Sequence, residues 1–365
     1  MPIALQQRKF PRRFTGMTES ESPPTDLPPG ASATAPWSMP RAAWYKVLKR
    51  VWVMIGFHEL GLLAAGLAFY TFLAITPLIA STVMIYGLVG NVETVREQME
   101  GLAQVLPADA AHVLEAQLIQ IVSTSSGVTG LALLIAFFFA IFGAMRAASG
   151  MISALNVIYE ERETRGTIAL SLRAAALTLA AILIALTGVL SGGVFAWLQT
   201  QTSVYLGSAT QTLFKSLTWV AAIALGSGGF ALIMRYGPDR RPAKWRWLAP
   251  GALMATVLWM LISFGFSLYV AYISDYNAMY GSLSAIVVFL MWLFLSAYGV
   301  LVGALLNAEI ERQTFHDTTV GPARPPGERG AILADRADNT VPSLRALQKL
   351  KTQRAEAERK HADGN

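Results

Sequence analysis

The chain contains no cysteine among its 365 residues. Disulfide bonds, zinc–thiolate sites, iron–sulfur clusters and cysteine nucleophiles are therefore excluded. Charged residues are also scarce, at 14% of the chain against roughly 25% in a soluble domain. They are unevenly placed: the chain has 29 basic and 23 acidic residues, and only 21 of these charged residues together lie in residues 60–308. A soluble protein with so few charges in its middle would have little polar surface.

Residues that commonly carry catalysis are missing as well. The four histidines, at positions 58, 112, 316 and 361, are far apart and form no metal-binding motif. The sequence has no Walker loop and no serine-hydrolase elbow. No long apolar run contains Asp or Glu, whereas proton-coupled pumps usually place an acid in the membrane. We therefore expect no catalytic residue, no cofactor and no metal, and a protein that is not an enzyme.

Long apolar runs dominate the middle of the chain, which is 54% hydrophobic overall. A helix needs about 20 apolar residues to cross the hydrocarbon core of a bilayer. The predicted spans are residues 66–89, 128–149, 174–198, 217–236, 248–272 and 281–306. The expected fold is an all-α polytopic membrane protein, with a six-helix transmembrane domain over residues 58–312.

Lysine and arginine alternate along the segments that flank the spans. From the N-terminus to the C-terminus these segments hold 8, 1, 3, 1, 5, 0 and 10 basic residues. Because cytoplasmic loops of membrane proteins are enriched in Lys and Arg, both termini are predicted to be cytoplasmic. The net charge of +6 then indicates contact with anionic lipid headgroups at the cytoplasmic face, and no nucleic acid partner.

The two ends of the chain are polar. Residues 1–40 are basic and rich in Pro and Ser, which predicts a disordered tail. Residues 41–57 combine apolar helical spacing with basic residues such as Arg50, the pattern of an amphipathic helix in the membrane interface. The alternative is a helix that packs on a partner protein. Residues 313–365 are expected to be largely disordered, with a short charged helix at 343–360.

Arg146 is the one charged residue inside a predicted span. Arginine at the bilayer centre costs roughly 2.5–3.5 kcal/mol on insertion scales. Counted from Val128, Arg146 lies about 27 Å along its helix, close to the expected cytoplasmic boundary. It is either a snorkelling interfacial residue or an anion or headgroup contact that faces a cavity. Asn156 and Asn307 are candidates for lining the same polar cavity.

Two spans contain residues that interrupt helices. Pro77 removes a backbone donor from the first span and is a candidate kink. Gly226, Gly228 and Gly229 form a second candidate kink in the fourth span. Interrupted helices point to binding sites in transporters. The alternative is ordinary close packing, because Gly and Pro are tolerated in membrane helices.

Several short motifs resemble the YihY/BrkB family of bacterial inner-membrane proteins. The motifs are Ala64–Tyr70, Ala154–Tyr159, Pro250–Ala252, Tyr280–Leu283, Trp292, Ser296–Tyr298 and Gly303–Ala308. The resemblance covers about residues 40–312 and implies a six-helix bundle of the bacterial inner membrane. This chain has Leu305 where the family pattern usually has Glu, and Glu309 follows one turn later.

Family members have carried the label of ribonuclease BN, which is regarded as a misassignment. Nuclease chemistry needs clustered carboxylates for metal ions. Glu160, Glu161 and Glu163 are close in sequence, but Arg162 and Arg165 alternate with them, which is typical of a solvated loop. The sequence therefore does not favour a membrane-tethered ribonuclease.

Two functions stay open. The first is a non-enzymatic membrane protein that transports or flips a lipid or a small amphiphilic solute. The second is a structural or scaffold protein of the cell envelope, acting as a homo-oligomer or with an envelope partner. A polar cavity lined by Arg146, Asn156 and Asn307 would favour the first, and a solid bundle would favour the second.

Overall fold

The fold is all-α in the part of the chain that the structure, a computed structural model, describes: residues 28–89, 130–202, 208–272 and 283–336. The helices are η1 (Pro36–Ser38), α1 (Arg41–Phe57), α2 (Leu60–Val89), α5 (Gly130–Ile158), α6 (Thr167–Thr202), α7 (Ser208–Tyr236), α8 (Trp245–Tyr272), α10 (Leu283–Glu311) and α11 (Ile332–Asp335). Within these ranges one isolated β-bridge joins Ala243 and Thr319, and no strand is present. The predicted all-α class is confirmed.

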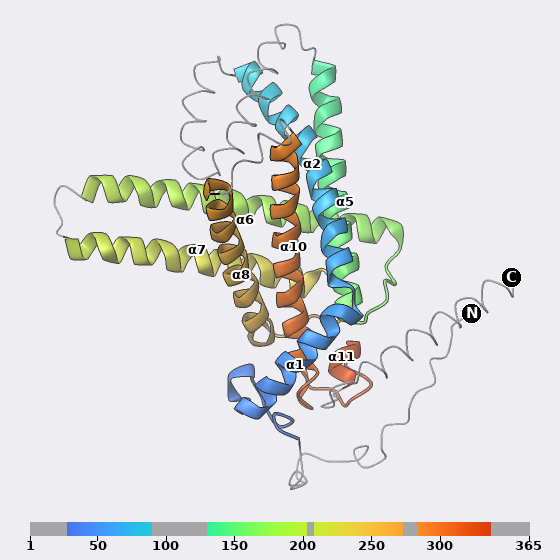
Figure 1. Cartoon of the computed structure of the whole chain (residues 1–365). Coiled ribbons are helices and arrows are strands. Elements are labelled where there is room, and N and C mark those ends of the chain that lie inside the picture. The colour runs from blue at the N-terminus through green and yellow to red at the C-terminus, as the bar shows by residue number, and fades with distance from the viewer. Residues whose placement is uncertain (1–27, 90–129, 203–207, 273–282, 337–365) are drawn as a thin grey trace, which may run out of the picture.

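Three long helices stand side by side at the centre of the molecule. α2 packs against both α5 and α10, and α8 packs against the other side of α10. The helices α6 and α7 form a hairpin that lies across this group and extends beyond it (Figure 1). The hairpin is joined to the group through both helices, since α6 contacts α5 and α7 contacts α8.

Five of the described helices, α5, α6, α7, α8 and α10, are long and apolar enough to cross a membrane. A sixth candidate is the pair formed by α1 and the first half of α2, which meet at 64°. The chain turns between them at His58 and Glu59, and Glu59 has a positive φ of 53°. The described part therefore holds five or six candidate spans, as expected for a polytopic membrane protein.

The candidate kinks lie inside continuous helices. α2 runs through Pro77, and α7 runs unbroken through its three glycines. Two of these glycines lie where another helix comes close: a Cβ on Gly226 would be 3.2 Å from Thr256, and one on Gly229 would be 3.4 Å from Ile184. These contacts favour the packing role of the glycines. Among the described helices, a break with a bend of 64° lies between α1 and α2.

A close crossing joins α8 to α10. A Cβ built on Gly251 would lie 2.1 Å from the carbonyl oxygen of Gly303, and one on Gly303 would lie 2.8 Å from Ala255 Cβ. Only glycine leaves room for such an approach of two backbones. The crossing positions the buried side chain of Asn307, one turn beyond Gly303, against the start of α8.

The first helix, α1, packs on α10 with one face and exposes the other. Ala43, Val47 and Met54 are buried in the apolar core, whereas Trp52 is 79% exposed. Arg50 lies on the buried face, with no exposed surface. The expectation that Arg50 adds positive charge to an interfacial surface is therefore wrong.

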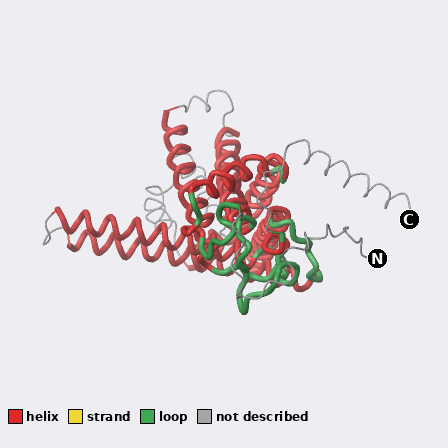
Figure 2. Tube along the Cα trace, turned by 90° about the horizontal axis from the view of Figure 1, so that it is seen from below, coloured by secondary structure: helices red, strands yellow, loops and turns green. Residues whose placement is uncertain are grey.

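A layer of loops covers one end of the helix group, and we call it the basal layer: residues 28–40, 159–166, 237–244 and 312–336 (Figure 2). Its segments are tied by backbone hydrogen bonds, for example from Lys244 N to Thr318 O at 2.8 Å.

Residues 28–40 and 312–336 are thus folded, although their composition predicts disorder. Thr314 Oγ1 donates to Ala33 O at 2.8 Å and joins the two segments. Gln313 Nε2 donates to Pro29 O at 2.7 Å. Polar side chains satisfy the backbone of these irregular segments, which composition alone does not reveal. The predicted helix at 343–360 lies outside the described residues.

Candidate functional site

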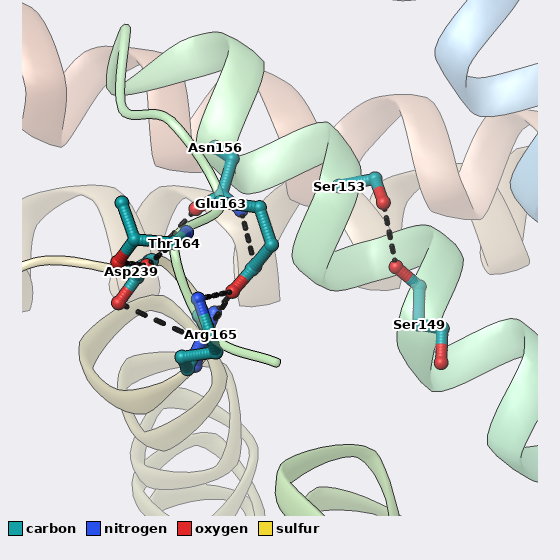
Figure 3. Close-up of polar contacts among 8 residues, drawn as sticks. Ser149, Ser153, Asn156, Glu163, Thr164, Arg165 and Asp239 are labelled. Carbon is teal, nitrogen blue, oxygen red and sulfur yellow. Dashed lines mark hydrogen bonds and ion pairs between the residues drawn. The ribbon is translucent and has the colours of Figure 1, made fainter. Parts of the chain in front are cut away.

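Asn156 lies in the last turn of α5, at the centre of a polar cluster beside the basal layer (Figure 3). Its Nδ2 donates to Glu163 Oε2 at 2.8 Å, and its Oδ1 accepts the backbone N–H of Asp239 at 2.8 Å. Only 5% of the residue is exposed. Asn156 therefore links the α5–α6 loop to the α7–α8 loop, and both ends of its amide are occupied within the protein.

The charges around Asn156 are also paired. Arg165 lies 2.6 Å from Glu163 and 3.6 Å from Asp239 and donates to Gly237 O at 3.0 Å. The hydrogen bond from Arg165 lowers the pKa of Glu163. Burial alone would raise the pKa of Asp239, but hydrogen bonds from Thr164 and the charge of Arg165 lower it. This cluster stays ionised and paired near neutral pH, so it offers no free base for catalysis.

A second network lies deeper in the basal layer. Arg240 forms a bidentate pair with Glu311, at 2.6 and 2.7 Å, and its guanidinium lies 4.8 Å from the centre of the Tyr159 ring. The Arg240 and Glu311 side chains are 2% and 3% exposed. Thr318 donates a further hydrogen bond to Glu311. The pair fastens the end of α10 to the α7–α8 loop.

The short helix α11 docks on the acidic residues of the α5–α6 loop. Ile332 N donates to Glu161 Oε1 at 2.7 Å, and Arg336 lies 3.2 Å from Glu160. Burial raises the pKa of Glu161 to about 7, and the backbone hydrogen bond from Ile332 opposes that rise. Glu161 is thus part of a folded contact that changes charge near neutral pH, and not of a solvated loop.

Asn307 is buried where α8 meets α10. Its Oδ1 accepts the N–H of Gly251 at 2.7 Å, and its Nδ2 donates to Leu248 O at 2.9 Å. Leu305, at the position where the family pattern usually has Glu, has no exposed surface and belongs to the apolar core. This region is a packed helix contact.

A buried ion pair ties α1 to α10. Arg50 Nε lies 2.6 Å from Glu309 Oε2, Arg50 Nη1 donates to Gln313 Oε1 at 2.7 Å, and Arg50 Nη2 donates to the carbonyl of Glu309 at 2.8 Å. Sequence reasoning missed this pair, although a signal was present. Arg50 falls on the same helical face as Ala43, Val47 and Met54, where a solvent-facing residue would not lie.

Arg146 differs from all these groups because its side chain is exposed on the outside of α5. Its guanidinium lies 5.1 Å from the centre of the Phe142 ring. Among the residues that the structure describes, it forms no hydrogen bond and no ion pair. α5 continues to Ile158, and Arg146 lies near the middle of its apolar stretch, residues 135–158.

The three residues predicted to share a polar cavity lie in three different settings. Asn156 is at the end of α5 that contacts the basal layer, Asn307 is between α8 and α10, and Arg146 is on the outer surface of α5. In the described ranges no hydrogen bond or ion pair links any two of them. No group of three or more His, Asp or Glu side chains there is placed to hold a metal ion. Of the three, Arg146 is the one with an exposed side chain.

Known proteins that are similar to this chain include membrane proteins. The chain is 26% identical over 273 residues to a ribonuclease-like protein, YfkH, of Bacillus subtilis, covering 73% of this chain and 95% of that protein. It is 28% identical to a UPF0761 membrane protein of Paraburkholderia xenovorans over 68% of this chain and 56% of the relative. It is 27% identical to a UPF0761 membrane protein of Rhodospirillum centenum over 82% of this chain and 63% of the relative.

The chain thus spans little more than half the length of these UPF0761 relatives. No solved structure matches it. The sequence profile described as "Virulence factor BrkB" matches residues 51–328, which include α2 to α10 and most of the basal layer. A match over that much of the chain shows that this membrane protein belongs to the Virulence factor BrkB family.

Proposed function

We propose that this protein binds the phosphate group of a phospholipid on the outer surface of α5, and that it handles lipids or small amphiphilic solutes without enzymatic chemistry. The observation that carries the proposal is Arg146, an exposed cation with no hydrogen bond or ion pair among the described residues. A guanidinium offers five N–H donors and recognises phosphate in a bidentate way. A lipid phosphate is the anion that a membrane supplies.

The position of Arg146 supports this proposal over simple snorkelling. Twelve residues, or about 18 Å of helix, separate it from Ile158. Arginines that snorkel lie near helix ends, whereas one at the membrane centre costs roughly 2.5–3.5 kcal/mol. A bound phosphate would offset that cost by pairing the charge. The aromatic neighbours Phe138 and Phe142, 64% and 46% exposed, add an apolar surface for acyl chains.

An internal route for a solute has less support. Asn156 and Asn307, the other two candidate residues, direct their amides to partners inside the protein. We therefore propose that lipid contacts the surface of the bundle, and that any movement of the lipid follows that surface.

The second candidate function is a scaffold of the cell envelope. It is supported by the paired and buried networks of Arg50 with Glu309 and Arg240 with Glu311, which fasten α1 and the α7–α8 loop to α10. A homo-oligomer or an envelope partner would then use the exposed surfaces of the protein, and Arg146 would contact lipid without selectivity.

Native mass spectrometry separates the two candidates. Wild-type protein is purified with stepwise removal of lipid and compared with Arg146→Ala and with Arg162→Ala, a control in which an exposed arginine outside the spans is removed. We expect phospholipid adducts to survive in the wild type and in Arg162→Ala and to be lost in Arg146→Ala. Equal retention in all three proteins would reject the lipid site and leave the scaffold.

A further inference from the structure

Arg146 begins a polar stripe on an otherwise apolar stretch of α5. Ser149 and Ser153 follow at i+3 and i+7, so the three side chains share one face of the helix. Arg146 and Ser153 are exposed, and Ser149 is partly exposed. The stripe is about 10 Å long, from seven residues at 1.5 Å each, and it runs from the middle of the apolar stretch towards the basal layer.

The hydroxyls of this stripe have spare hydrogen-bonding capacity. Ser153 Oγ donates to the carbonyl of Ser149 at 3.0 Å, which leaves its lone pairs free (Figure 3). The Ser149 hydroxyl forms no hydrogen bond among the described residues, so its donor is free as well. A free hydroxyl next to an unpaired guanidinium is a donor set suited to a phosphate oxygen.

The surroundings of the stripe are apolar and aromatic. On the side away from the basal layer it continues into Phe142 and Phe138, at four-residue spacing from Arg146. On its flank, α2 comes close, because a Cβ placed on Gly150 would lie 3.4 Å from the Tyr70 ring. A phosphate bound at the stripe would therefore have rings beside it, against which acyl chains can lie.

We propose that the stripe of Arg146, Ser149 and Ser153 holds the phosphate group of a glycerophospholipid, with Arg146 pairing the charge and Ser149 donating a hydrogen bond. This inference rests on the proposed function and names its ligand class. Inorganic phosphate has the same oxygen chemistry, but it has no chains to cover Phe138 and Phe142, which are largely exposed. The adjoining aromatic surface therefore favours the lipid.

The position of the stripe also indicates the side from which a lipid headgroup would approach Arg146. A hydroxyl at Ser153 lies between Arg146 and the polar cluster of Asn156, so polar groups occur at each turn from the basal layer to Arg146. Of the two hydroxyls, Ser149 has a free donor, so a phosphate that approaches from the basal side would gain a hydrogen bond at Ser149 and a charge partner at Arg146. Lipid is expected to reach Arg146 from the basal side.

The test is a binding titration of the purified full chain in detergent, followed by native mass spectrometry. Three probes are used: short-chain phosphatidylglycerol, short-chain phosphatidylcholine and inorganic phosphate. The variants are Arg146→Ala, Ser149→Ala and Ser153→Ala. The control is Ser191→Ala, which removes a hydroxyl from α6 that bonds to its own helix at Gly188 O.

We expect both phospholipids to bind, and inorganic phosphate to bind at least tenfold more weakly. Ser149→Ala should weaken lipid binding about tenfold, the lower end expected for a hydrogen bond to a charged group. Arg146→Ala should abolish binding, and Ser191→Ala should not change it. Arg146→Lys keeps the positive charge but lacks the planar guanidinium that binds phosphate through two donors, and it should bind lipid with intermediate affinity.

The outcomes separate this inference from the function on which it rests. Loss in Arg146→Ala with wild-type affinity in Ser149→Ala would reject the stripe and keep a lipid contact at Arg146. Equal binding of inorganic phosphate and phospholipid would reject the lipid as the ligand. Equal lipid binding by Arg146→Ala and wild type would overturn both proposals.

Discussion

The ion pair between Arg50 and Glu309 makes a prediction that can be worked through from the structure. The two side chains are 0% and 2% exposed, and Arg50 also donates to Gln313. Replacing Arg50 by Met keeps an unbranched apolar side chain and removes the charge and all three hydrogen bonds. Glu309 is then left buried, with Arg312 Nη1, 3.8 Å away, as its remaining cation.

Breaking a buried pair from one side costs about 3–5 kcal/mol, because the other charge stays buried without its partner. The contact with Arg312 places the expected cost of Arg50→Met at the lower end, about 3 kcal/mol. Replacing both partners is different, because no unpaired charge remains. The double variant Arg50→Met with Glu309→Leu should therefore recover most of the loss, and a double-mutant cycle should give a coupling of about 2 kcal/mol or more.

The assay is unfolding of the purified protein in mixed micelles with increasing denaturing detergent, followed by tryptophan fluorescence. Lys49→Met is the matched control, since Lys49 is the exposed neighbour of Arg50 on the same helix. Exposed substitutions usually change the free energy of unfolding by no more than about 0.5 kcal/mol. If Arg50→Met costs no more than Lys49→Met, or if the cycle shows no coupling, the pair does not hold α1 on α10.

Three further predictions concern the basal layer and the helix crossing. The pKa of Glu161 is raised from 4.5 to about 7 in the folded protein, so docking of α11 should be strongest below pH 4.5 and weaken as pH rises through 7. Glu161→Gln should remove that pH dependence. The measurement is hydrogen exchange of residues 331–336, corrected for the intrinsic exchange rates. Asn307→Ala leaves the Gly251 N–H and the Leu248 carbonyl without partners and should cost about 2–4 kcal/mol in the micelle assay. Gly303→Ala should also destabilise, because its Cβ would lie 2.4 Å from Gly251 O, whereas Gly265→Ala on α8 meets nothing within 4 Å and should be neutral or stabilising.

The membrane helices could be predicted because each rests on a local property. Twenty or so consecutive apolar residues define a span wherever their neighbours lie, and each predicted span falls on one helix of the structure. The helical pattern of the second span continues past residue 149 to Tyr159 in the sequence, and α5 ends at Ile158. In the structure its last turns are helical, and Leu155 and Ile158 are buried within them.

The basal layer could not be predicted because its contacts join residues that are far apart in the sequence. Glu161 is separated from Ile332 by 171 residues, and Arg240 from Glu311 by 71. Composition described these segments correctly as polar and rich in Pro and Gly. It could not indicate that their carbonyls and charges would be paired with one another. Arg146 was singled out from the sequence, but its exposure and its lack of a partner required the helix packing.

The distance in sequence between Arg50 and Glu309 has a consequence for biogenesis. The two residues are 259 positions apart, and a ribosome adds roughly 5–20 residues per second. Arg50 must therefore wait about 13–50 s after its own synthesis before its partner exists. During that time α1 cannot be locked in place, and it must remain in contact with water, lipid headgroups or an insertion factor. Closure of the α1–α10 contact is thus a late step of assembly, and a chain that stops before α10 keeps Arg50 without its partner.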